Sequence, residues 1–259
     1  MKIAIIGYGK MGRMIESIAR EKGHTIGSCI DVDNQDLLSA DSLSQHDAAI
    51  EFTVPETAYG NVSKCLDAGI PVVSGTTGWT DRLGELAERC VKESGSFLYA
   101  SNFSLGVNLL FYMNRHLATI MNRHIQYDVR MSETHHTQKL DAPSGTALTL
   151  AEDILAEIER KKNWALLEGS SSTGPAGRND VNPDSRNDAD LDPKKLWIEA
   201  IREGTVAGIH EVSYESEFDS LSLRHSAKDR RGFANGAVLA AEFIHDKKGF
   251  FSMKEVLDL

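Results

Sequence analysis

The stretch that decides the fold is residues 2–12, which read Lys2-Ile3-Ala4-Ile5-Ile6-Gly7-Tyr8-Gly9-Lys10-Met11-Gly12. The first five residues are mainly apolar and predict a short buried strand. Gly7, Gly9 and Gly12 follow at once as Gly-x-Gly-x-x-Gly, and residues 10–22 continue with the apolar spacing of a helix. A strand, a glycine turn and a helix in this order are typical of a dinucleotide-binding βαβ unit.

Each glycine of this turn has a physical role in such a unit. The first permits the tight turn, the second lets the backbone approach a pyrophosphate, and the third lets the helix and strand pack closely. The phosphates would meet the N–H groups and the positive dipole end of the helix. A plain glycine turn between a strand and a helix is the alternative. We predict that the pyrophosphate is bound by Gly7, Gly9, Lys10, Met11 and Gly12.

The choice between NADH and NADPH depends on the end of the second strand. Asp31 lies 19 residues after Gly12, where an acid hydrogen-bonds the adenosine ribose hydroxyls. Val32 follows, Asp33 and Asp36 come soon after, and no Arg or Lys stands nearby to hold a 2′-phosphate. Adjacent carboxylates repel a phosphate that carries nearly two negative charges. We therefore predict NADH as the preferred cofactor and NADPH as the less favoured one.

Strands and helices alternate through the first hundred residues. Further strands are predicted at residues 24–30, 48–52, 71–74 and 97–100, and helices at residues 55–69 and 83–91. This alternation predicts a doubly wound parallel sheet, whose ligands bind at the carboxyl ends of the strands. Polar loops follow the fourth and fifth strands at that edge and suit the nicotinamide half of the cofactor. The predicted contacts are Gly75, Thr76, Thr77, Ala100, Ser101, Asn102 and Phe103.

The pattern changes after residue 104 from alternating strands and helices to a helix, strand and helix followed by consecutive strands. Helices are predicted at residues 104–122, 144–162, 233–245 and 252–257, and strands at 126–135, 196–201, 206–218 and 220–225. Residues 169–192 are rich in Ser, Asn, Asp, Gly and Pro and predict a long surface loop. The fold class is therefore α/β: a Rossmann-like parallel sheet domain, followed by a second α+β domain with an open, mixed and mainly antiparallel sheet.

Composition narrows the partners. The formal net charge of −10 argues against nucleic acid or an anionic membrane, although it permits an anionic small molecule held by a local cluster of donors. No apolar run is long enough to cross a bilayer, and the first strand leaves no room for a signal peptide. The three cysteines are odd in number and far apart, so reduced thiols in a cytoplasmic protein are expected.

The densest polar cluster of the chain runs from Glu133 to Thr146, between a strand end and a helix start. Ser144 or Asp141 can cap the helix, and the backbone N–H groups at its start form an anion pocket with the helix dipole. This cluster supplies the local donors that an anionic substrate needs. The residues expected to act here are His135, His136, Lys139, Ser144, Gly145 and Thr146.

The same cluster is also compatible with a metal site or with a purely structural role. Histidine is a common metal ligand, but no third ligand stands at regular spacing, and Lys139 would repel a cation. We therefore predict no metal. A capped helix with incidental histidines is the structural alternative, since consecutive strand residues such as His135 and His136 point to opposite faces unless the strand has ended.

Residues 133–147 read Glu-x-His-His-x-x-Lys-x-Asp-Ala-Pro-Ser-Gly-Thr-Ala, which resembles the signature of the 4-hydroxy-tetrahydrodipicolinate (dihydrodipicolinate) reductase family. The resemblance covers nearly the whole chain. It includes the glycine turn and the segments Phe52-Thr53-x-Pro55-Glu56, Gly75-Thr76-Thr77-Gly78, Ser101-Asn102-Phe103-Ser104-x-Gly106-Val107-Asn108, Gly208-x-His210 and Phe233-Ala234-Asn235-Gly236-Ala237. Residues 169–195 depart from the family's pattern, and 196–204 stand where the family often has an Arg-Gly-Glu-Ile-Gly-like segment.

The resemblance implies an NAD(P)H-dependent reductase of diaminopimelate and lysine biosynthesis that acts on a small cyclic dicarboxylate. By its pattern, His135 is the acid/base, Lys139 is the proton donor and His136 contacts the substrate, while Gly145 and Thr146 hold a carboxylate. It also implies a homotetramer joined through the open sheet. The final helices return to the first domain, which gives residues 1–104 with 226–259 and a substrate and oligomerisation domain of residues 105–225.

Two other functions are also compatible with the residues when the family resemblance is set aside. Another two-domain nicotinamide dehydrogenase would share the first 104 residues but would not need Ser-Gly-Thr after His-His-x-x-Lys. A non-catalytic NAD-binding protein would keep the glycine turn without a lysine beside an anion pocket.

Overall fold

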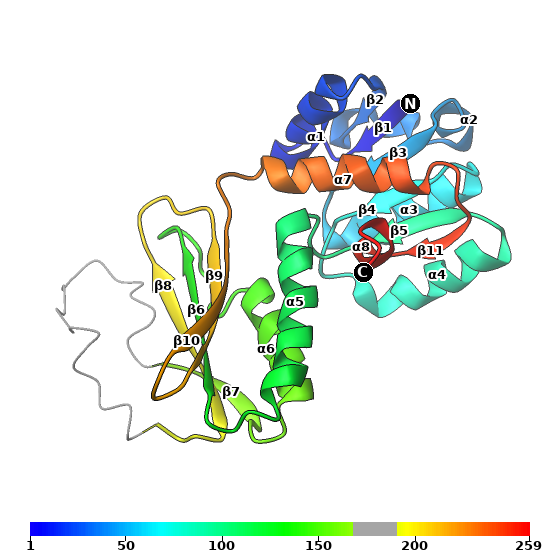
Figure 1. The fold of residues 1–259 in the computed structure, drawn as a ribbon. Coiled ribbons are helices and arrows are strands. Elements are labelled where there is room, and N and C mark those ends of the chain that lie inside the picture. Colours follow the sequence, from blue (N-terminus) through cyan, green and yellow to red (C-terminus); the bar gives the residue numbers. More distant parts are fainter. Residues whose placement is uncertain (168–190) are drawn as a thin grey trace. The chain divides into compact units, whose positions relative to one another are not determined.

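The computed structural model describes residues 1–167 and 191–259 (Figure 1). The described chain divides into two compact units, which we treat separately. Unit 1 comprises Met1–Asn108 and Arg230–Leu259, and unit 2 comprises Leu109–Asp229. Most of the predicted surface loop at 169–192 lies outside the described residues. No helix in the described part of the chain is long and apolar enough to cross a membrane.

Unit 1 contains a six-stranded parallel sheet in the order β11-β5-β4-β3-β1-β2. Its strands are β1 (Lys2–Ile6), β2 (Thr25–Ile30), β3 (Ala48–Glu51), β4 (Val72–Ser74), β5 (Ser96–Tyr99) and β11 (Gly249–Phe251). The predicted Rossmann-like sheet is therefore confirmed. The sequence patterns missed β11, which is three residues long and pairs with β5 far away in the chain.

Helices cover both faces of this sheet (Figure 1). Alternate residues of β1 supply the two cores: Ile3 and Ile5 pack with α1 and α7, whereas Ala4 and Ile6 pack with α3 and α4. This alternation of buried side chains on both faces fits the doubly wound architecture. The helical elements are α1 (Lys10–Glu21), η1 (Val32–Leu37), α2 (Ala40–Leu43), α3 (Pro55–Asp67), η2 (Thr80–Arg82), α4 (Leu83–Lys92), α7 (Arg231–Ile244) and α8 (Met253–Val256).

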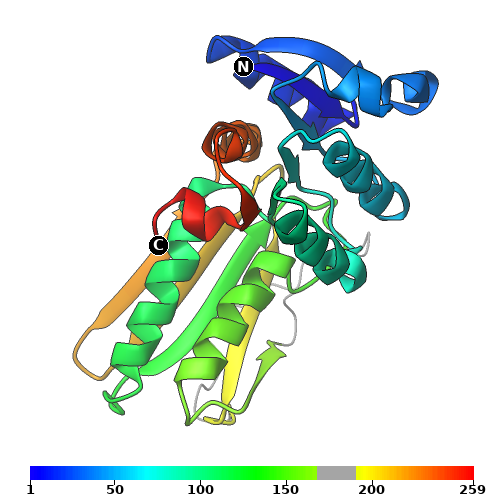
Figure 2. The same ribbon diagram turned by 90° about the vertical axis from the view of Figure 1, so that its right-hand side faces the viewer.

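Unit 2 contains a mixed sheet in the order β10-β9-β6-β8-β7. Its strands are β6 (Asp128–His135), β7 (Asn163–Leu166), β8 (Lys195–Arg202), β9 (Ile209–Glu215) and β10 (Ser220–Ser226). β6 pairs parallel with β8 and antiparallel with β9, so the predicted mixed sheet is confirmed. The prediction that it is mainly antiparallel is wrong, because β7 also pairs parallel with β8. α5 (Leu105–Met121) and α6 (Gly145–Glu157) pack on one face of it (Figure 2).

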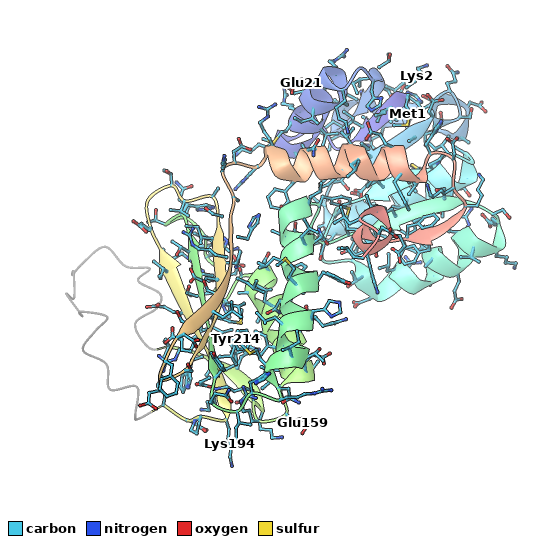
Figure 3. All side chains as sticks on the ribbon, viewed as in Figure 1. Met1, Lys2, Glu21, Glu159, Lys194 and Tyr214 are labelled. Carbon is cyan, nitrogen blue, oxygen red and sulfur yellow. The ribbon has the colours of Figure 1, made fainter. Side chains whose placement is uncertain are left out.

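One face of the unit 2 sheet is buried and the other is partly exposed. Residues of β6, β8 and β9 alternate between buried and half-buried, which is the pattern of a sheet covered on one side. Tyr214 of β9 is fully buried in the core that these strands form with α5 and α6 (Figure 3).

Three predicted boundaries in unit 2 are wrong. The helix predicted at 144–162 ends at Glu157, and the strand β7 begins at Asn163. The sequence did not predict β7, because this strand is fixed by pairing with β8 and not by a local pattern. The strand predicted at 206–218 is confined to Ile209–Glu215. Gly208, with φ at 154°, stands just before it.

Candidate cofactor and substrate sites

The glycine turn of unit 1 joins β1 to α1 by backbone geometry that side chains would prevent. Gly7 has φ at 94°, and a Cβ there would collide with the carbonyl oxygen of Phe52. A Cβ on Gly12 would collide with the carbonyl oxygen of Gly7. Gly9, in contrast, has nothing within 4 Å of the place where its Cβ would be. The fold itself thus requires Gly7 and Gly12, whereas Gly9 keeps open the space in front of α1.

A cavity of about 410 Å³ lies beside this turn. Gly7, Gly9, Asp31, Val32 and Thr53 are among the residues that line it. α1 has neither a side-chain cap nor an acidic residue in its first turn, so its N–H groups suit a phosphate. The lining of the cavity includes no Lys or Arg among the described residues. The chain therefore offers a nucleotide a backbone cradle, an acid and an apolar wall.

Asp31 stands directly after β2 with an exposed side chain. Its Oδ1 accepts the Val32 N–H at 2.9 Å, and its backbone N–H donates to Asn34 Oδ1 at 2.7 Å. These bonds fix the start of η1, where the Asp31 carboxylate also accepts the Asn34 N–H. The Val32 side chain is 80% exposed.

The predicted nicotinamide loops follow β4 and β5. Thr76 is buried, Thr77 and Ser101 are exposed, and Ala100 and Asn102 are half-buried. A Cβ on Gly75 would collide with the ring of Phe52. The side chain of Phe103 is buried against that ring, at a centroid distance of 5.5 Å, so only its backbone can reach a cofactor. None of these seven residues is among those described as lining the 410 Å³ cavity.

Glu51, the last residue of β3, connects the loops at this edge of the sheet, and it was not among the site residues predicted from the sequence. It is fully buried. Ser74 Oγ donates to its Oε2 at 2.6 Å, and Thr76 Oγ1 and the Thr53 N–H donate to its Oε1 at 2.8 and 3.0 Å. The Thr53 hydroxyl donates to Oε1 as well. Because Thr53 lines the cavity, this network fixes part of the cavity wall.

In unit 2 the buried face of the sheet becomes polar where β6 and β8 end. Along β6, buried Val129 and Met131 are followed on the same face by Glu133 and His135. His210 lies opposite Glu133 on β9, and Arg202 lies opposite His135 on β8. The strand register thus gathers four polar side chains from three strands.

Glu133 is the centre of this cluster and is fully buried. Its Oε1 accepts Arg202 Nη2 at 3.1 Å and the Ser144 N–H at 3.0 Å. His135 Nδ1 lies 3.4 Å from Oε2, within ion-pair distance but without hydrogen-bond geometry. Burial alone would raise the pKa of Glu133, yet the nearby His135 ring and the donors Ser144 and Arg202 outweigh it and lower that pKa to about 2.

β6 ends at His135, which is buried, and His136 begins the loop that follows. The two histidines are therefore not held to opposite faces of a continuing strand. The His135 ring packs edge-on against His210 at a centroid distance of 5.1 Å, and a Cβ on Gly208 would lie 3.1 Å from His135 Nε2. Gly208 therefore allows its backbone to approach the ring closely.

Lys139 lies in the loop between β6 and α6. Its Nζ donates to both carboxylate oxygens of Asp141 at 2.8 Å. The hydrogen bond from Lys139 is the main reason why the pKa of Asp141 is lowered. From the sequence, either Asp141 or Ser144 can cap the helix. In the structure Ser144 caps α6 by accepting the Ala147 N–H at 3.2 Å, and Asp141 instead pairs with the lysine.

The start of α6 carries the predicted anion pocket. Ser144 is buried, Gly145 is exposed and Thr146 is half-buried. Nothing stands within 4 Å of the place where a Cβ of Gly145 would be. α6 has 13 residues and no acidic residue in its first turn, and the Glu133 carboxylate binds the N–H of its cap, Ser144.

Among the described residues, Glu133, His135 and His210 place one ligand atom each within 4.8 Å of one another, as a metal site would require. The third group comes from β9 and could not be found from spacing. However, the Arg202 guanidinium group binds the same carboxyl group and opposes a cation there. The absence of a metal stays a prediction, favoured by charge.

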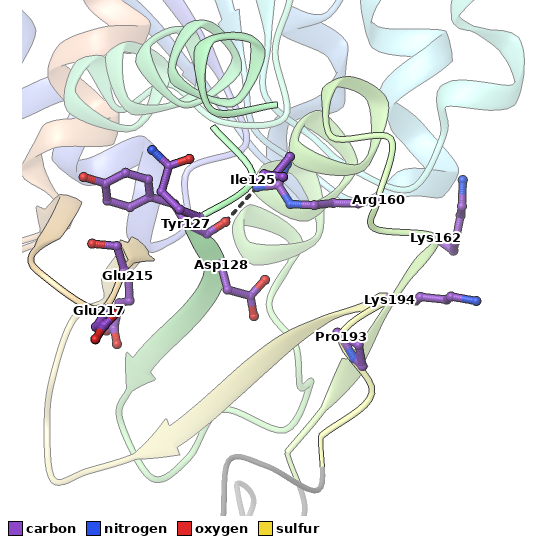
Figure 4. Close-up of a pocket in the computed structure, with 11 residues that line it drawn as sticks. Ile125, Tyr127, Asp128, Arg160, Lys162, Pro193, Lys194, Glu215 and Glu217 are labelled. Carbon is purple, nitrogen blue, oxygen red and sulfur yellow. Dashed lines mark hydrogen bonds between the residues drawn. The ribbon is translucent and has the colours of Figure 1, made fainter. Parts of the chain in front are cut away.

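A second cavity of about 600 Å³ lies in unit 2 beside Tyr127, Asp128 and Arg160, whose Nη2 donates to the Tyr127 carbonyl at 2.9 Å (Figure 4). Asp128 begins β6 and His135 ends it. Seven residue-to-residue steps along the strand place them about 23 Å apart. This cavity is therefore distinct from the polar cluster.

Comparison with known proteins assigns the chain to a family. Residues 1–103 match the family model "Dihydrodipicolinate reductase, N-terminus", and residues 106–257 match "Dihydrodipicolinate reductase, C-terminus". The chain belongs to the dihydrodipicolinate reductase family. The family predicted from residues 133–147 is thereby confirmed, as is the prediction of an oxidoreductase of diaminopimelate and lysine biosynthesis that binds a nicotinamide dinucleotide.

Relatives in the dihydrodipicolinate reductase family align along the full chain. The 4-hydroxy-tetrahydrodipicolinate reductase of Christiangramia forsetii is 44% identical over 99% of this chain and 98% of its own. That of Neisseria meningitidis serogroup A is 31% identical over 100% and 98%. The solved structure of a dipicolinate-bound dihydrodipicolinate reductase from Paenisporosarcina sp. TG-14 has a TM-score of 0.73 at 20% identity, covering 97% of each chain, and supports the fold.

Proposed function

We propose that this member of the dihydrodipicolinate reductase family reduces 4-hydroxy-tetrahydrodipicolinate to tetrahydrodipicolinate, with the cofactor on unit 1 and the dicarboxylate on unit 2. The observation that carries the proposal is the polar end of the unit 2 sheet. It joins buried His135, the Lys139 ammonium group and the N–H groups at the start of α6.

One carboxylate of the substrate binds at the start of α6. The donors are the N–H groups of Gly145 and Thr146 and the Ser144 hydroxyl, and the helix dipole favours the negative charge. His136 contacts the substrate from the loop that begins beside His135. These groups fix the ring in one orientation before the reaction.

Lys139 donates the proton. When bound, the reduced nicotinamide would supply a hydride to the ring carbon conjugated with the C=N bond, a system that the 4-hydroxy substrate presents once its hydroxyl group has left as water. Negative charge would then build on the ring as the anion of an enamine, and the ammonium group stabilises this charge and delivers a proton to it. The substrate competes with Asp141 for Lys139, because both are anionic. His135 acts as the neighbouring acid/base.

The residues of unit 1 fit the cofactor. Gly7, Gly9, Lys10, Met11 and Gly12 form the pyrophosphate cradle, and Asp31 binds the adenosine ribose. The loops after β4 and β5 hold the nicotinamide half through the backbone and polar groups of Gly75, Thr76, Thr77, Ala100, Ser101, Asn102 and Phe103.

We further propose that NADH is preferred to NADPH. The cavity is lined by Asp31 and exposed Val32 and has no basic side chain among its described lining residues. A comparison of kcat/KM for the two cofactors tests this. NADH is expected to be favoured at least about tenfold, and Val32→Arg to narrow the ratio by attracting the 2′-phosphate. A wild-type preference for NADPH would refute the assignment.

We also propose a homotetramer joined through the outer face of the unit 2 sheet, where Ile201 is exposed. Light scattering during gel filtration is expected to give four times the chain mass of 28.5 kDa. A monomer would refute it.

The activity assay follows loss of nicotinamide absorbance while the preceding pathway enzyme generates the dicarboxylate in place. Oxidation that depends on this substrate is expected. A chain that binds NADH but never oxidises it would instead be a binding protein, and a chain that oxidises it only with other substrates would be a different dehydrogenase.

A further inference from the structure

Arg202, the last residue of β8, contacts the loop that carries Lys139. Its side chain is only 2% exposed. Nη2 donates to the Asp141 carbonyl oxygen at 2.7 Å, and Nε donates to the Lys139 carbonyl oxygen at 3.3 Å. Nη1 donates to the carbonyl oxygen of Ile201 at 2.8 Å. The guanidinium group therefore holds the backbone on both sides of residue 140.

The same guanidinium group is paired with Glu133, at 3.1 Å between Nη2 and Oε1. That oxygen also accepts the N–H of Ser144, which caps α6. One buried ion pair thus connects the end of β8, the Lys139 loop and the first turn of α6. These are the parts that carry the proton donor and the carboxylate pocket of the proposed function.

We infer that Arg202 is a positioning residue for the reduction: it sets the distance and orientation between Lys139 and the anion pocket at the start of α6. The inference rests on the proposed function for the roles of these two groups. Arg202 itself need not contact the substrate, since its described donors are directed to protein oxygens.

The contacts explain why an arginine is needed. A guanidinium group is planar and presents donors in several fixed directions, so one side chain can bind a carboxylate and two carbonyl groups together. A lysine would keep the charge but has a single ammonium group on a flexible stem. A buried ion pair can often be replaced by apolar residues without loss of stability, so the fold alone does not demand this residue.

Three variants and one control test the inference. Arg202→Lys keeps the charge, Arg202→Met removes it, and Arg202→Met with Glu133→Gln removes both charges, so that no unpaired charge is buried. The control is Arg224→Met in β10 of the same sheet, because Arg224 is 53% exposed and lies 3.4 Å from Glu211. For each protein, kcat and KM for the dicarboxylate, the NADH dissociation constant and the melting midpoint are measured.

We expect kcat/KM for the dicarboxylate to fall about 100-fold in Arg202→Lys and in the double variant, the size of loss that a misplacement of about 1 Å can produce. The NADH dissociation constant is expected to stay within about twofold of wild type, because unit 1 keeps its own contacts. Rates are taken below each protein's melting midpoint, and Arg224→Met is expected to match wild type.

Two results would overturn the inference: near wild-type kcat/KM in Arg202→Lys, or a loss of NADH affinity parallel to the loss of kcat/KM, which would show general disruption. The wild-type chain in the same assay separates the inference from the proposed function. An inactive wild type refutes the proposed function, whereas an active wild type with an equally active Arg202→Lys refutes only the inference.

Discussion

Lowering the pH is expected to destabilise unit 2 through His210. This side chain is only 4% exposed, and burial is the main reason why its pKa is lowered from 6.5 to about 4. Nearby His135, His225 and Lys139 lower it as well, and only Glu133 raises it. The folded state therefore resists protonation of His210, whereas the unfolded state accepts the proton at its ordinary pKa.

The magnitude follows from this shift. The folded pKa lies below the unfolded pKa, so stability is intact above pH 6.5 and falls as the pH decreases toward 4. Proton linkage gives a loss of about 2 kcal/mol at pH 5 and about 3 kcal/mol at pH 4, relative to neutral pH. Glu133, whose pKa is lowered from 4.5 to about 2, adds a further loss of about 1 kcal/mol at pH 4, because the unfolded state takes up that proton, and this loss is common to wild type and to a variant of His210.

Urea unfolding between pH 7 and pH 4 measures this effect when wild type is compared with His210→Gln, which cannot be protonated. Trp164 and Trp197 report on unit 2, and a Trp79→Phe background removes the tryptophan of unit 1. We expect the free energy of unfolding to fall about 3 kcal/mol further in wild type than in the variant. Equal pH slopes for the two proteins would refute the assignment of a buried neutral His210.

Two further predictions concern unit 1. Gly9→Ala is expected to leave the melting midpoint nearly unchanged and to weaken NADH binding at least about tenfold, because its Cβ would meet no protein atom and would occupy the path of the pyrophosphate. Gly12→Ala is expected to lower the melting midpoint itself. Equal behaviour of the two variants in calorimetry and NADH titration would contradict this difference. Glu51→Gln is expected to destabilise unit 1 by about 1–3 kcal/mol in urea unfolding, because the amide turns a donor toward donors; an unchanged midpoint would exclude the proposed network.

Much of unit 1 could be predicted from the sequence because its signals are local. The glycine turn identifies β1 and α1 by composition alone, and Pro55 at the first turn of α3 marks where that helix begins. β11 and β7 were missed because each is short and exists through pairing with a distant strand. Pairing energy of this kind leaves no periodicity in the strand's own residues.

The candidate site likewise contains residues that local sequence signals predict and residues that they do not. Lys139 and the capped start of α6 lie within one continuous segment, so their residue types and spacing could be interpreted directly. The role of Arg202 could not, because it depends on the register between β6 and β8. Glu133 could have been found: alternation from Val129 and Met131 places it on the buried face, where a carboxyl group requires partners.

In the proposed reduction, Lys139 donates the proton while unit 1 holds the cofactor. Lys139→Ala is measured against the exposed Lys162→Ala as a control, with kcat for the dicarboxylate and the NADH dissociation constant determined on the same preparations. We predict that kcat falls about 10³-fold in Lys139→Ala alone, with NADH affinity unchanged in both. A kcat close to wild type in Lys139→Ala would exclude Lys139 as the proton donor.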